Sequence, residues 1–84
     1  MRRRAYLIRK GLQFLQCMYD PAGFEFDPAP DKLVPKYTVY KFDAARIRRV
    51  TDAVMIMQLL QMRTEDELSI VRFDTLTGEV QELP

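Results

Sequence analysis

LSIVRFD at residues 68–74 and EVQEL at residues 79–83 predict a β-hairpin in this 84-residue chain. The first stretch is rich in branched and aromatic side chains, which favour strands. The residues between the two stretches end in Gly78, at a place where such a turn needs a left-handed backbone. Apolar side chains occur on both alternating faces of residues 68–74, so we expect this strand to be central in its sheet.

Toward the N-terminus, residues 5–19 predict an amphipathic helix. At about 100° per residue the apolar side chains gather on one half of a helical wheel, whereas strict alternation would separate Leu7 from Ile8. The prolines that follow end this helix. Residues 20–36 contain four of the five prolines of the chain, and we expect them to form a long Pro-rich loop.

A strand and a second helix are predicted in the middle of the chain. Residues 37–42 (YTVYKF) favour a strand, and Asp43 is suited to cap a helix that runs from Ala44 to about Arg63. The predicted order is helix, loop, strand, helix and hairpin. We therefore expect an α+β fold in a single compact domain over residues 1–84, with two helices packed on a small three-stranded, mainly antiparallel sheet.

The charge of the chain is sorted by position. Residues 1–50 contain eleven Lys/Arg and five Asp/Glu, a net charge of +6, whereas residues 51–84 contain two Lys/Arg and seven Asp/Glu, a net charge of −5. If the fold keeps the two halves apart, one surface attracts anions and another attracts cations. This polarity indicates a binding function, directed at a polyanion or at another protein.

The second predicted helix has more apolar residues than one buried face requires. Eight of the ten residues from 53 to 62 are apolar. Met55, Leu59 and Met62 lie nearly opposite the face that would pack on the sheet, so they form a candidate partner interface, either with a second copy of the chain or with another protein. Two alternatives remain open at this point: these side chains are covered within the chain, or the stretch is a strand.

Basic side chains near the N-terminus suggest a second kind of partner. Phosphate binding requires cations on one face, often with aromatic side chains on which bases can stack. No helix-turn-helix spacing and no other nucleic-acid-binding motif is present. A membrane-surface role for an amphipathic helix over residues 1–19 ranks lower. The candidate phosphate-binding residues are Arg2, Arg3, Arg4, Arg9 and Lys10, with Tyr6, Tyr37 and Tyr40 as candidate stacking partners.

An enzymatic function is not expected. The chain has no His, a single cysteine (Cys17) and three glycines, so it lacks the usual base near neutral pH, a cysteine metal site and a Gly-rich phosphate loop. We expect no metal, no cofactor and no small-molecule substrate. The lone cysteine suits a reducing compartment, so we expect a cytoplasmic protein, and the longest apolar run is too short to span a membrane.

These observations predict a small, non-enzymatic binding protein. In the favoured hypothesis it is a homodimer, or an accessory or inhibitory subunit that docks on another protein through the apolar helix face. The alternative is a nucleic-acid-binding accessory protein that uses the basic N-terminal half. The two hypotheses differ in their response to salt, because phosphate binding weakens steeply with salt and an apolar interface persists.

Overall fold

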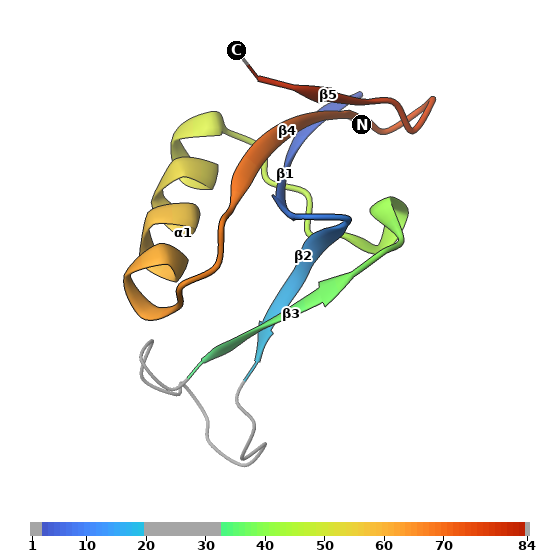
Figure 1. Ribbon diagram of the computed structural model, residues 1–84. Coiled ribbons are helices and arrows are strands. Elements are labelled where there is room, and N and C mark those ends of the chain that lie inside the picture. The colour runs from blue at the N-terminus through green and yellow to red at the C-terminus, as the bar shows by residue number, and fades with distance from the viewer. Residues whose placement is uncertain (1–2, 20–32, 84) are drawn as a thin grey trace.

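The computed structural model describes residues 3–19 and 33–83 and shows one five-stranded antiparallel sheet with a single α-helix among these residues (Figure 1). The strand order is β3-β2-β1-β4-β5, so β1 and β4 lie inside the sheet. The elements are β1 (Arg4–Lys10), β2 (Gln13–Tyr19), β3 (Val34–Thr38), the short 3-10 helix η2 (Lys41–Asp43), α1 (Val50–Arg63), β4 (Ser69–Asp74) and β5 (Val80–Glu82).

The helix predicted over residues 5–19 is wrong. These residues form β1 and β2, which are joined by a two-residue turn in which Gly11 has a φ of 59°. β1 is buried on both faces, with Leu7 and Ile8 both fully covered, so its apolar residues do not alternate with polar ones. The adjacent apolar residues of a two-sided strand therefore resembled one face of a helix.

The predicted three-stranded sheet with two helices is consequently wrong as well, and only the broad α+β class remains. The predicted C-terminal hairpin is present as β4 and β5, with Gly78 at a φ of 78°. β4 lies between β1 and β5, and both of its faces carry apolar residues because Ile70 packs in the core on the α1 side and Val71 and Phe73 pack in the core on the opposite side. Of the predicted Pro-rich loop at 20–36, residues 34–36 belong to β3, and residues 20–32 lie outside the described residues.

The region between β3 and α1 also differs from the prediction. β3 ends at Thr38, and α1 begins only at Val50, so Asp43 caps no α-helix. In between, Ile47 forms an antiparallel bridge with Tyr6 through backbone hydrogen bonds of 2.8 and 2.9 Å. The pairs between β1 and β2 lie only beside the turn that joins them. The extended segment around Ile47 therefore supplies the hydrogen-bond partners of the β1 backbone at Tyr6.

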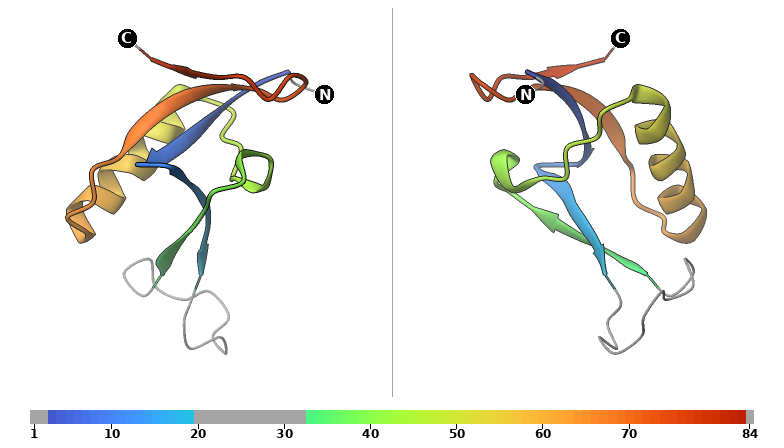
Figure 2. Two further views of the ribbon diagram at one scale, coloured as in Figure 1. Left: turned by 45° about the vertical axis from the view of Figure 1, so that its right-hand side comes forward. Right: turned by 180° about the vertical axis from the view of Figure 1, so that it is seen from behind.

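The core has two parts, one on each face of the sheet. α1 covers the first face, where Ala53 and Leu60 pack with Ile8. On the opposite face, Leu7 and Phe73 pack with residues that include Ala44, which directly follows η2. Figure 2 shows α1 and the segment around η2 on opposite sides of the sheet. Both faces of the central strands are therefore occupied, and the outward-facing side of α1 is left uncovered.

The turn between β4 and β5 is held by the carboxylate of Asp74. This group accepts hydrogen bonds from the backbone N–H groups of Leu76 (2.9 Å) and Thr77 (3.1 Å). Nε of Arg3 donates a third bond of 2.9 Å. The hydrogen bond from Thr77, followed by those from Leu76 and Arg3, holds the pKa of Asp74 below its ordinary value of 3.8.

We expect Asp74→Ala to lower the free energy of unfolding at neutral pH, because three donors lose their acceptor. The pKa of Asp74 is lowered in the folded state, so its carboxylate stabilises the fold above pH 3.8, and this contribution is lost as the pH falls below that value. Urea midpoints of the wild type and the variant should converge between about pH 7 and about pH 3. A gap of equal size at both pH values would contradict this account.

The two glycines with positive φ provide a matched pair of substitutions. A side chain in this conformation costs about 1–2 kcal/mol, so Gly11→Ala and Gly78→Ala should both destabilise the fold. A Cβ atom at Gly78 would also lie 2.7 Å from Cζ of Phe42, whereas nothing lies within 4 Å of one at Gly11. Urea unfolding should therefore show the larger loss for Gly78→Ala. Equal losses would contradict a close packing of Phe42 on this turn.

Candidate interaction surfaces

The outer face of α1 carries three large apolar side chains, here called the α1 apolar row. Met55, Leu59 and Met62 are 67%, 45% and 84% exposed, and they line up along the helix because they are four and three residues apart. The inner face instead buries Ala53 and Leu60. The α1 apolar row is therefore not part of the core, and the alternative that this stretch is a strand is wrong.

Two opposite charges flank the α1 apolar row. Asp52 lies in the first turn of α1 and Arg63 in the last, where each complements the helix dipole. At about 100° per residue both side chains project from the same flank of the row, and both residues are exposed. The exposed surface of α1 therefore combines an apolar centre with an acidic end and a basic end on one side.

The structure does not bring the predicted phosphate-binding residues together. Arg3 and Arg4 stand at the start of β1, whereas Arg9 and Lys10 stand at its other end. A seven-residue strand spans about 20 Å, so the two pairs face different surroundings. Arg2 lies outside the described residues.

Most of these cations are also paired with carboxylates of the C-terminal half. Nε of Arg3 lies 2.9 Å from Oδ2 of Asp74, and Nζ of Lys10 lies 3.2 Å from Oδ1 of Asp66. A further ion pair joins Arg9 to Glu82. The halves of opposite charge are thus interleaved, because β1 pairs with β4 and β4 with β5.

A different group of arginines surrounds a surface hollow of about 180 Å³. Its lining residues include Arg4, Arg46 and Arg48, and we call this place the arginine hollow. The side chains of Arg46 and Arg48 lie on the face of the sheet that carries Phe73, whereas the side chain of Arg4 projects to the other face. The guanidinium of Arg46 also lies over the ring of Phe73, 5.5 Å from the ring centroid. The remaining lining residues are Ala5, Ile47 and Thr75.

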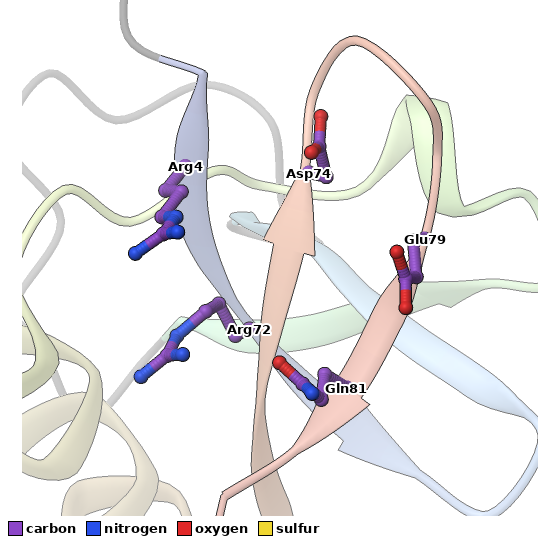
Figure 3. A pocket seen from close by; sticks show the side chains of 5 residues that line it. All are labelled: Arg4, Arg72, Asp74, Glu79 and Gln81. Atoms are coloured by element: carbon purple, nitrogen blue, oxygen red, sulfur yellow. The ribbon is translucent and has the colours of Figure 1, made fainter.

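A second, smaller hollow of about 90 Å³ also has Arg4 among its lining residues (Figure 3). Figure 3 shows Arg4 and Arg72 extending toward the same side, away from the carboxylates of Asp74 and Glu79. Gln81 completes its lining. This second hollow therefore contains both signs of charge, whereas the lining of the arginine hollow contains none of the carboxylates.

Arg46 and Arg48 were not predicted to be neighbours, because the helix predicted from Ala44 to about Arg63 would point residues two apart to different sides. In an extended segment such residues point to the same side. The alternation of Arg46, Ile47 and Arg48, with the apolar residue inward, was the available signal. It was obscured by the strongly apolar helix that follows.

The tyrosines proposed as stacking partners are spread over the molecule. Tyr6 and Tyr37 are partly buried against the core, whereas Tyr40 is 69% exposed. Nζ of Lys10 lies 4.8 Å from the ring centroid of Tyr37, and burial, followed by the charge of Asp66, raises the pKa of this tyrosine. Of these three tyrosines, only Tyr40 has an open aromatic face. It lies beside η2 and does not line the arginine hollow.

Other chemistry has little support in the described part of the chain. Residues 3–19 and 33–83 contain no group of three side chains placed to hold a metal ion. Cys17 is a free, exposed thiol on β2. No α-helix formed by these residues has the length and apolar character that crossing a membrane would take.

Comparison with protein-family models, with curated proteins and with solved structures finds no match for this chain.

Proposed function

We propose that the chain is a non-enzymatic interaction protein that binds a protein partner through the α1 apolar row. The observation that carries this proposal is the exposure of Met55, Leu59 and Met62 on one face of a helix whose opposite face is buried. Contiguous apolar surface of this kind marks association sites, and flexible methionines are enriched in such interfaces. The absence of His in the sequence supports a binding role over acid–base catalysis.

The partner that best fits this surface is a second copy of the chain. In an antiparallel helix pair related by a two-fold axis, each flank of one helix faces the same flank of the other. Asp52 of each copy would then face Arg63 of its partner. The midpoint between Asp52 and Arg63 lies one residue, or about 1.5 Å, from the midpoint between Met55 and Met62. The same two-fold axis therefore brings the two apolar rows into contact and places Asp52 opposite Arg63.

The two kinds of contact have different roles in this dimer. Burial of the α1 apolar row supplies the attraction, at about 25 cal/mol for each Å² of apolar surface removed from water. The two exposed ion pairs add little affinity but select the antiparallel orientation over the parallel one. Because the row is short, association is expected to depend on concentration and to persist at high salt.

Met55→Glu combined with Leu59→Glu should convert the dimer into a folded monomer, because four carboxylates would meet at the interface. Light scattering over a range of protein concentrations measures the mass, and circular dichroism checks the fold. Gln61→Glu combined with Gln81→Glu is the matched control, since it adds the same charge at exposed positions away from the row. Loss of fold in the first variant, or a wild type that is monomeric at every concentration, would contradict the proposal.

A charge exchange tests the antiparallel arrangement. Asp52→Arg alone and Arg63→Asp alone each place like charges opposite one another, so each variant should dimerise more weakly than the wild type. An equimolar mixture of the two variants restores opposite charges at both contacts and should recover the dimer. Sedimentation of the separate and mixed samples measures this. A mixture that is no heavier than its components would show that these residues do not face each other.

A further inference from the structure

The arginine hollow is produced by backbone geometry and side-chain size. Ile47 pairs with Tyr6 through two backbone hydrogen bonds, so residues 46–48 run antiparallel to the start of β1. In this extended segment Arg46 and Arg48 project to the same side. The small side chain of Ala5 lines the hollow between them and leaves the space open.

Among the described residues, no carboxylate compensates the positive charge of this hollow. Arg4, Arg46 and Arg48 form no ion pair with another residue of segments 3–19 and 33–83. The nearby carboxylate of Asp74 is already engaged by Arg3 and by two backbone donors. The like charges of Arg46 and Arg48 at one hollow repel one another, and a bound anion would relieve this repulsion.

The position of Arg46 gives one of these charges a defined place. Its guanidinium lies over the buried ring of Phe73, an arrangement in which the aromatic face attracts the cation. The planar guanidinium group keeps its N–H donors along its edge, where they can bind two oxygens of one anion. The stacked arginine is therefore partly ordered before any ligand arrives, which lowers the entropic cost of binding.

We propose that the arginine hollow binds the phosphate groups of a nucleic-acid backbone. Arginine binds phosphate oxygens in a two-pronged geometry, and the two neighbouring arginines, Arg46 and Arg48, match the charge of adjacent phosphates in a strand. The hollow measures about 180 Å³, below the 300–1,000 Å³ typical of pockets that enclose small molecules. A free nucleotide would remain largely exposed there, whereas a polymer brings several phosphates to the same surface.

This site is separate from the proposed dimer interface. It is formed by β1, by the segment before α1 and by the β4–β5 turn, and none of its lining residues belongs to the α1 apolar row. It also replaces the phosphate-binding set predicted from the sequence, since Arg3, Arg9 and Lys10 are paired with carboxylates. Failure of one proposal therefore leaves the other standing.

Fluorescence anisotropy with a short labelled oligonucleotide, single-stranded or duplex, tests the proposal. With two phosphates neutralised, the logarithm of the binding constant should fall with the logarithm of the salt concentration at a slope of about −1.4 for a single strand and about −1.8 for a duplex. Arg46→Gln combined with Arg48→Gln should flatten the single-strand slope to near zero. The same variant should weaken binding at low salt by about tenfold for each arginine.

The control variant is Lys36→Gln combined with Lys41→Gln, which removes the same charge from β3 and η2. The proposal holds if this control keeps the wild-type slope while the arginine variant loses it. Equal losses in both variants would show attraction by overall charge and would overturn the site. Arg48→Gln alone leaves the Arg46–Phe73 contact intact, so a lowered slope in that variant cannot be attributed to a damaged core.

Two competitors distinguish the source of the anion. If inorganic phosphate displaces the oligonucleotide at an equal concentration of phosphate groups, the site binds small anions, and the proposal of a nucleic-acid ligand is wrong. If polyglutamate competes as well as an unlabelled oligonucleotide does, the site fits an acidic protein partner, and the proposal of a nucleic-acid ligand is wrong. Light scattering of Arg46→Gln with Arg48→Gln should give the wild-type mass, which keeps this result independent of the dimer proposal.

Discussion

The pairing of β1 with β4 is the constraint on which the rest of the structure depends. It joins the two ends of the chain over six register pairs, from Arg4 with Asp74 to Arg9 with Ser69. Both strands have apolar side chains on both faces, so the pair is stable only when each face is covered. α1 covers one face, and the segment after η2 covers the other. β2 and β5 pair directly with these two strands, and β3 joins them through β2.

The same pairing determines what happens to the charge polarity of the sequence. Because the basic N-terminal strand lies beside the acidic C-terminal part of the chain, Arg3, Arg9 and Lys10 form ion pairs with carboxylates. Such exposed pairs add little to stability, but they remove charge from the surface. Arg46 and Arg48, which the segment before α1 holds beside the start of β1, form no ion pair among residues 3–19 and 33–83. Folding thus replaces the charge difference between the two halves of the sequence with a local positive charge at the arginine hollow.

The two proposed surfaces follow from one structural feature, the segment between η2 and α1. Its bridge with Tyr6 fixes Ile47 in the core and turns Arg46 and Arg48 outward. It also delivers the chain to Val50, where α1 begins with its inner face on Ile8 and Leu15. The outward orientation of the α1 apolar row is a consequence, because a helix with apolar residues all round can bury only one side on a single sheet.

The sequence by itself determined the C-terminal hairpin, its glycine turn and the excess of apolar residues on α1, because these depend on local turn chemistry and on helical spacing. It did not determine β1 and β2. The adjacent residues Leu7 and Ile8 are covered by different layers, and no local pattern indicates that both faces of a strand will be buried. The arginine hollow was likewise decided by tertiary structure, since Arg4 and Arg46 become neighbours only when the segment before α1 joins β1. Long-range backbone pairing, rather than local preference, selected both.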